Sequence, residues 1–210
     1  MSRYIGPVCR LCRREGMKLF LKGDKCFTKC VLEKRKSIPG EHGKAYQSRK
    51  ASEYHKRLRE KQKLRRMIGL GEAPFRRYFA NAASRPGLTG ENLLRYLETR
   101  LDNVTQRLGF AISKVAARQM VLHGHILVNG KSVNMPSYAL KPGDTVALKE
   151  ASRANPVFLR WWEQSHKSST FPSWLESSQP AFSGQVKSWP MRDEMSFPVN
   201  EQLIVELYSK

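Results

Sequence analysis

Apolar positions recur at helical spacing between residues 53 and 108 of this chain. Three successive amphipathic stretches predict helices over 53–68, 73–84 and 91–108. Ser52 precedes the first as its predicted N-cap, and Gly109 follows the third in the usual place of a helix C-cap. The aromatic residues of the second stretch fall on one face, so we expect them in a hydrophobic core.

The spacing changes beyond the third stretch. Ser113 is the predicted N-cap of a further helix in SKVAARQMVLHG, after which HILVNGKSVN takes up strand spacing. Its dipeptide Asn129-Gly130 is typical of a two-residue type I′ hairpin turn, and TVALKE predicts a returning strand. These elements predict a helix-helix-hairpin-strand unit near 98–150, followed by a helix over 151–167.

The C-terminal part of the chain has a weaker pattern. Residues 168–198 are rich in Ser and Pro with scattered aromatics, which predicts irregular chain packed over another lobe. The tail VNEQLIVELYSK carries consecutive apolar residues, which predicts a buried strand.

The net charge of the chain indicates a negatively charged partner. The 210 residues hold 38 Lys and Arg against 18 Asp and Glu, a formal net charge of +20 that is heaviest in residues 1–77. Such an excess needs a polyanion: RNA, DNA or an anionic membrane. No apolar run approaches the ~18 residues of a membrane span, and the N-terminus lacks the apolar stretch of a signal peptide. We therefore expect a soluble cytoplasmic protein that binds nucleic acid.

All four cysteines, Cys9, Cys12, Cys26 and Cys30, lie near the N-terminus in the pattern C-x2-C-x13-C-x3-C. Two close pairs of thiolates can converge on one tetrahedral ion, so we expect a single structural Zn2+. An iron–sulfur cluster on the same thiolates and a disulfide pair are the alternatives. Four thiolates would leave no open position for water or substrate.

Catalytic chemistry is not predicted. The chain contains no HExxH, GxSxG or P-loop motif, and every cysteine belongs to the proposed metal site. The one close histidine pair, His123 and His125, lies at a predicted helix-to-strand turn, where a structural role is expected. We interpret the chain as a non-enzyme.

Basic residues in four places are expected to meet RNA phosphates, although solvated surface charge is the competing interpretation for each. They occur at the N-terminus among the cysteines, in the loop 44–50 that has no acidic residue, on the first long helix with few carboxylates beside them in sequence, and in the helix-helix-hairpin unit. The candidate RNA-binding residues are Arg3, Arg10, Arg13, Arg14, Lys22, Lys44, Arg49, Lys50, Arg57, Arg59, Lys61, Lys63, Arg65, Arg66, Ser113, Lys114, Arg118 and Lys131.

The segment RLDNVTQRLGFAISKVAARQMVLHGHILVNGKSVNMPSYALKPGD closely resembles the RNA-binding module named after small-subunit ribosomal protein four. The motifs RYIGPVCRLCRREG, FLKGDKC, PGEHGK, LREKQKLRRMIGL, FRRYF, TGENLL and PVNEQLIVELYSK resemble the bacterial type of that family, in order and over essentially the whole chain. The cysteines place it with the four-cysteine, zinc-binding form, although three residues lie between Cys26 and Cys30 where some relatives have four.

The resemblance implies an α+β fold in four segments: a four-cysteine metal-binding lobe at 1–45, a mainly α-helical domain at 46–97, an inserted helix-helix-hairpin RNA-binding module at 98–167, and a C-terminal segment at 168–210 that completes the helical domain. It implies a structural component of the small ribosomal subunit, a primary binder of 16S rRNA that nucleates assembly of the body around a five-way junction. It also implies contact with ribosomal protein five, a place on the path by which mRNA enters, and a contribution to translational accuracy.

Two interpretations from other classes stay open on the sequence. An RNA-modifying enzyme could carry the same module, but it would need a second, catalytic domain for which the chain has no room. A zinc-dependent regulator on DNA would need a recognition helix with base-reading side chains.

Overall fold

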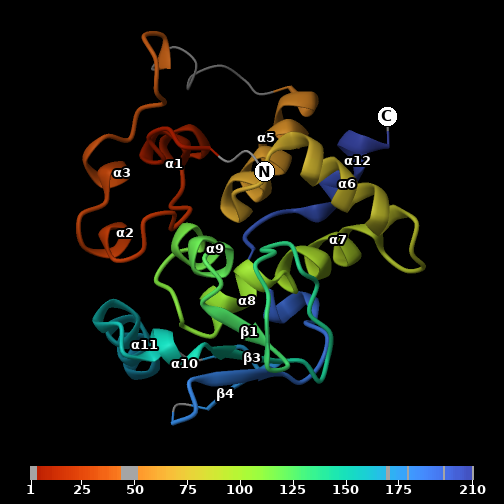
Figure 1. The fold of residues 1–210 in the computed structure, drawn as a ribbon. Coiled ribbons are helices and arrows are strands. Elements are labelled where there is room, and N and C mark those ends of the chain that lie inside the picture. Colours follow the sequence, from red (N-terminus) through yellow and green to blue (C-terminus); the bar gives the residue numbers. More distant parts are fainter. Residues whose placement is uncertain (1–3, 44–51, 169–170, 179, 196, 210) are drawn as a thin grey trace. The chain divides into compact units, whose positions relative to one another are not determined.

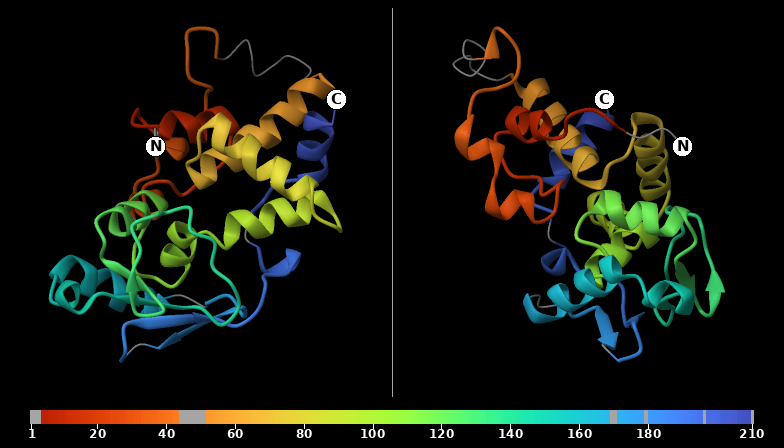
Figure 2. Two further views of the ribbon diagram at one scale, coloured as in Figure 1. Left: turned by 45° about the vertical axis from the view of Figure 1, so that its right-hand side comes forward. Right: turned by 60° about the vertical axis from the view of Figure 1, so that its left-hand side comes forward.

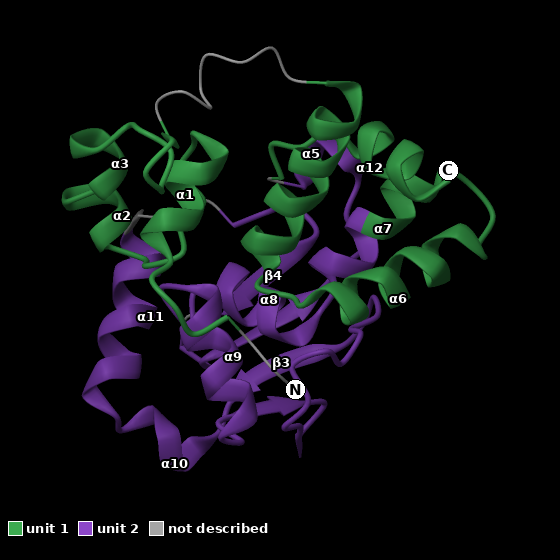
Figure 3. Cartoon of the chain, turned by 90° about the horizontal axis from the view of Figure 1, so that it is seen from above, with its two compact units in different colours: residues 1–93, 197–210 green, residues 94–196 purple. Residues whose placement is uncertain are grey.

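The chain folds into helices and one antiparallel sheet, an α+β structure as expected (Figure 1). The computed structural model describes residues 4–43, 52–168, 171–178, 180–195 and 197–209. The chain divides into two units, one formed by residues 1–93 and 197–210 and the other by 94–196 (Figure 3). No helix in the described ranges is long and apolar enough to cross a membrane.

The first unit begins with a lobe of three short helices, α1 (Cys9–Glu15), α2 (Lys25–Thr28) and α3 (Val31–Lys34). Cys12 and Leu19 are the only apolar side chains that the structure buries within the described residues 4–43. The lobe therefore has almost no hydrophobic core of its own, as expected of a segment that something other than packing must hold together.

The rest of this unit is helical. Ser52 caps α5 as predicted, its Oγ accepting a hydrogen bond from His55 N at 3.2 Å. The C-terminal helix lies beside α5 (Figure 2). Its Tyr208 ring stacks on Phe79, with ring centroids 4.5 Å apart. The helices are α5 (Glu53–Ile68), α6 (Glu72–Ala83), α12 (Glu201–Tyr208) and the start of α7 (Thr89–Glu98).

The C-terminal strand prediction is wrong, because 201–208 form α12. Asn200 starts this helix, its side chain accepting a hydrogen bond from Gln202 N. Only Ile204 is fully buried, while its neighbours in the run LIV are half-exposed. A short apolar run fits a strand or a helix equally well by period, and packing against α5 decides for the helix here.

The second unit is built around a five-stranded antiparallel sheet in the order β2-β1-β3-β5-β4. Its elements are α8 (Leu101–Arg107), α9 (Lys114–Leu122), β1 (Ile126–Val128), β2 (Lys131–Ser132), β3 (Thr145–Leu148), α10 (Glu150–Arg153), α11 (Pro156–Ser168), β4 (Leu175–Ser178), β5 (Ser183–Val186) and the 3-10 turn η1 (Arg192–Glu194). The predicted hairpin is confirmed: Val128 pairs with Lys131 across Asn129 and Gly130, which both have positive φ (50° and 78°).

The single helix predicted over 91–108 is two helices, α7 and α8. Arg100 between them has extended backbone (φ −66°, ψ 140°) and forms an isolated bridge with Ala139. Thr99 O also accepts a hydrogen bond from Leu140 N at 3.0 Å. The helix breaks here because the backbone pairs with a distant segment instead of continuing the helix. The leucines on both sides of the break are still buried. The helix predicted over 151–167 is likewise two, α10 and α11.

Residues 175–186 were expected to be irregular but form β4 and β5. β5 pairs with β3, with Val146 opposite Gly184. A Cβ on Gly184 would lie 2.5 Å from Leu108 Cδ2, so this strand needs glycine to approach α8 closely. The division of the chain therefore differs from the expected one: 168–196 belong with the sheet, and only 197–210 belong with the helical unit.

Candidate nucleic-acid interface

The six cations predicted on α5 are all ion-paired with carboxylates. Arg57 Nε lies 2.6 Å from Glu206 Oε2, and Lys61 Nζ lies 2.8 Å from Glu72 Oε1. The remaining contacts are Arg65 with Glu72 at 3.6 Å, Lys63 with Glu60 at 2.5 Å, Arg59 with Glu15 at 3.6 Å, and Arg66 with Glu15. Their side chains are between 8% and 23% exposed.

The premise that α5 has too few carboxylates nearby is therefore wrong. Glu15 comes from α1, Glu72 from α6 and Glu206 from α12, so only the fold brings them to this helix. The Glu15 side chain is 1% exposed, and two guanidinium groups compensate its buried charge. These six cations share four carboxylates and form a network of ion pairs within the unit.

Among the described residues, the exposed cations lie mostly outside the predicted set. Of the lobe's predicted cations, Arg10 and Lys22 are exposed; Arg13 Nε instead donates to Ser37 O at 2.9 Å, and Arg14 is half-buried. Helical periodicity alone could have pointed to Arg76 and Arg77, which lie opposite the apolar face of α6. Cations that are exposed and were not predicted as RNA-binding include Lys25, Lys29, Lys34, Arg35, Lys36, Arg76, Arg77 and Arg85.

A cavity of about 240 Å³ lies in the same unit, where α1 faces α5. It is lined by Arg10, Leu11, Arg14, Pro39 and Arg66. Three guanidinium groups around one opening give it a positive lining.

In the second unit, Lys131 is exposed next to the hairpin turn, as predicted. Ser113 Oγ accepts a hydrogen bond from Ala116 N at 3.3 Å, so this hydroxyl serves as the cap of α9. Lys114 Nζ is buried although part of its stem is exposed. Burial lowers the pKa of Lys114 to about 8, opposed by the nearby charge of Glu98. The lysine therefore faces the protein interior.

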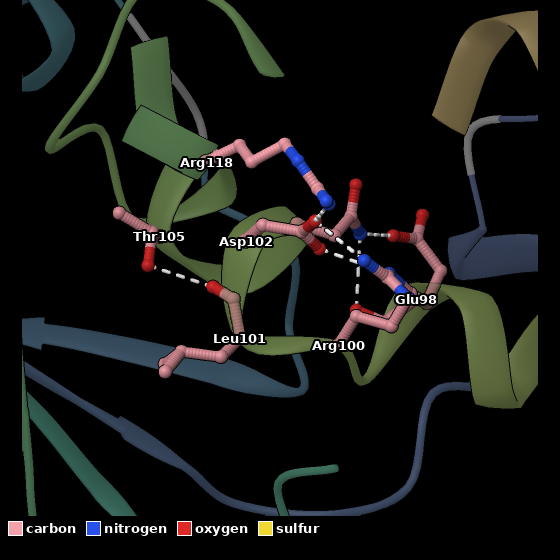
Figure 4. A network of polar contacts seen from close by, with 7 residues as sticks. Glu98, Arg100, Leu101, Asp102, Thr105 and Arg118 are labelled. Carbon is pink, nitrogen blue, oxygen red and sulfur yellow. Dashed lines mark hydrogen bonds and ion pairs between the residues drawn. The ribbon is translucent and has the colours of Figure 1, made fainter. Parts of the chain in front are cut away.

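Arg118 belongs to a buried polar network rather than to the open surface (Figure 4). Arg100 donates to both oxygens of Asp102, from Nε at 2.9 Å and from Nη2 at 2.6 Å, and Arg118 Nη1 lies 3.3 Å from the same carboxylate. Glu98 lies 2.7 Å from Arg107 and accepts from Asn103. The network links α7, α8 and α9 at the point where the predicted long helix breaks, so it holds the module's helices in register.

The four cysteines lie close enough to influence one another. Burial raises the pKa of Cys12, the backbone hydrogen bond at Leu19 opposes this, and the other three thiols raise it further. Lys22 N donates to Cys26 Sγ at 3.3 Å, an interaction that suits a thiolate. No three His, Cys, Asp or Glu side chains of the described residues are grouped as ligands of one ion would be. The metal therefore stays a prediction.

Arg3, Lys44, Arg49 and Lys50 complete the predicted set, and they lie outside the described residues.

Comparison with known proteins covers the whole chain. Residues 3–98 match the family model described as the ribosomal protein S4/S9 N-terminal domain, and residues 99–146 match the S4 domain. The chain is 54% identical over 211 residues to the small ribosomal subunit protein uS4 of Natranaerobius thermophilus, and 52% identical to those of Pelotomaculum thermopropionicum and Desulforamulus reducens. Each alignment spans 100% of both chains.

Proposed function

The chain belongs to the uS4 family of small ribosomal subunit proteins, and from this premise we propose that it is a primary binder of 16S rRNA that nucleates assembly of the subunit body. Members of this family are structural components of the small subunit and not enzymes. The observation that carries the proposal is the set of exposed cations, while the six predicted cations of α5 are each ion-paired within their unit.

This arrangement suits recognition of folded RNA. Exposed Lys and Arg side chains neutralise phosphates and release counterions, which makes affinity strongly dependent on salt. Within each unit, helices held by ion pairs present exposed cations on a folded surface. An RNA junction is recognised by its shape and backbone rather than by its base edges. Lys131 at the hairpin and Arg76 and Arg77 on α6 are the cations best placed for this role.

The test is a competition experiment with the full chain. The 16S five-way junction RNA should be retained in the presence of a large excess of unrelated duplex RNA. Equal competition by any duplex of the same length would reduce the protein to a nonspecific polycation and contradict the proposal.

We also propose that the four cysteines hold one structural Zn2+. The all-thiol donor set, the backbone N–H on Cys26 Sγ and the two-residue apolar core of the described lobe support this. The ion would crosslink the segments that carry the two cysteine pairs and supply no reaction chemistry. An iron–sulfur cluster on the same thiolates is the alternative, and metal analysis with an absorption spectrum of anaerobically purified protein separates the two.

Contacts with protein five and with mRNA, and a contribution to translational accuracy, are proposals that rest on the family resemblance. The mRNA contact would involve Lys44, Arg49 and Lys50. Replacing all three with Gln should slow translation through a stable mRNA hairpin more than through unstructured message. Equal slowing on both messages would assign these residues to docking on rRNA.

A further inference from the structure

Two phenylalanine rings of the N-terminal lobe lie together on its surface. Phe20 is 44% exposed and Phe27, on α2, is 70% exposed, and their ring centroids are 5.0 Å apart at an angle of 31°. Large aromatic side chains usually stabilise a folded protein by being buried, but these two rings remain exposed. Its exposed rings are therefore available to a partner.

The backbone beside the pair is strained. Phe20 has φ 51°, in the left-handed region that residues with a side chain seldom adopt. Such a conformation costs free energy, and it is retained where the surrounding structure or a function requires it. The ring of Phe20 is exposed, so packing in a hydrophobic core does not explain its strained backbone.

The segment of sequence that carries the pair is rich in lysine. Lys22, Lys25 and Lys29 are exposed, and among the residues that the structure describes none of the three forms an ion pair. The nearby Lys18 is different, because its Nζ lies 2.5 Å from Glu33 Oε1. Aromatic faces interleaved with free cations fit a nucleic-acid strand, whose bases stack while its phosphates are neutralised. An apolar protein partner would instead have to desolvate three ammonium groups.

We propose that Phe20 and Phe27 form a stacking platform for one unpaired base of the bound RNA, with Lys22, Lys25 and Lys29 on the flanking phosphates. This inference rests on the proposed function and adds an extruded nucleotide to it as a specific ligand. The lobe would then recognise an unpaired nucleotide by stacking, in addition to attracting RNA by its charge.

The test compares three variants of the full chain for affinity to 16S junction RNA at one salt concentration. Phe27→Leu keeps apolar bulk but removes the π face, and should weaken binding about tenfold. Phe27→Trp keeps a stacking face and should bind within about twofold of the parent. The matched control is Tyr54→Leu, which removes an aromatic ring of similar exposure (64%) from α5 and should leave affinity unchanged.

Each alternative outcome overturns the platform. Equal loss in Phe27→Leu and Phe27→Trp would indicate a contact set by the shape of Phe27 rather than by stacking. Unchanged affinity in Phe27→Leu, with the parent still specific for the junction, would refute the platform and leave the proposed function intact. If the parent itself showed no specificity for 16S rRNA, the proposed function would fail first. Thermal unfolding of each variant confirms that the comparison is made between folded chains.

Discussion

Arg57 Nε of α5 donates a hydrogen bond to Glu206 Oε2 of α12 at 2.6 Å, although 149 positions separate the two residues. Close by, Glu72 accepts hydrogen bonds from Lys61 Nζ at 2.8 Å and from the Tyr208 hydroxyl at 3.0 Å. The C-terminal helix is thus held to a highly basic helix by carboxylates and a phenol. The charged side chains of α5 therefore help to hold the helices of this unit together.

Neutralising Glu206 should therefore affect stability more than RNA binding. Glu206→Gln leaves Arg57, whose side chain is 21% exposed, without its partner, and should lower the free energy of unfolding by about 1 kcal/mol. Urea denaturation measures this. The control is Glu53→Gln, which breaks the exposed pair with Lys56 and should lower stability less than Glu206→Gln does. Equal effects of both variants would show that the Arg57–Glu206 contact stabilises the fold no more than an exposed ion pair does.

The Asp102 network should be far more sensitive. Asp102→Ala removes the carboxylate that accepts two hydrogen bonds from Arg100, which is 2% exposed, and should destabilise the protein by about 3–5 kcal/mol. Unfolding monitored by tryptophan fluorescence reports this, because Trp162 and Trp174 lie in the core of the same unit. The exposed Glu150→Gln should change stability by less than about 0.5 kcal/mol. A loss below about 1 kcal/mol in Asp102→Ala would show that water reaches Arg100.

Lys114 should give a pH-dependent contribution to stability. Burial lowers its pKa from the ordinary 10.5 to about 8, with Glu98 and Asp102 raising it and Arg107 and Arg100 lowering it further. Between these values the unfolded chain binds a proton that the folded chain does not, so this group's contribution to stability rises with pH from about 8 to 10.5 and is flat below about 8.

Removing the amine of Lys114 should therefore stabilise the folded protein most at neutral pH. Lys114→Met should be more stable than the parent by up to about 3 kcal/mol at pH 7, and the difference should shrink by pH 10. Denaturant titrations at both pH values give the difference, with Lys149→Met as a control at an exposed lysine. A difference that grows with pH would mean that Lys114 is stabilised as the cation.

The metal proposal has its own test. Cys26→Ser should lose stoichiometric metal and the hydrogen-exchange protection of the lobe, because two buried apolar side chains cannot hold its described residues folded. The sheet unit at 94–196, which has its own core, should keep its protection. Full protection of the lobe after chelation would rule out a structural metal.

Local signals in the sequence proved reliable. The caps at Ser52 and Ser113 and the Asn129-Gly130 turn depend on neighbouring residues alone, and all three are confirmed. The errors arise where distant segments meet. The break at Arg100 comes from pairing with 138–140, which no helical pattern within 91–108 contains.

The carboxylates around the α5 cations were missed for the same reason. A sequence window around α5 shows few acids among its cations, because Glu15 and Glu206 join them only in the fold. Arg76 and Arg77 could have been chosen instead, since the apolar face of α6 already places them outward. Residue type and local pattern identify the chemistry of the partner, and burial decides which charges can reach it.

The most direct test of this account compares two charge-matched triple variants for salt-dependent binding to 16S junction RNA. One replaces the exposed Lys34, Arg35 and Lys36 with Gln, and the other replaces the ion-paired Arg57, Lys61 and Lys63 with Gln. The plot of log affinity against log salt should flatten by about two in the first variant, at roughly 0.7–0.9 for each phosphate that is no longer neutralised. The second, checked by circular dichroism to be folded, should keep the parent's slope. A parental slope in the first variant and a flattened one in the second would contradict the account.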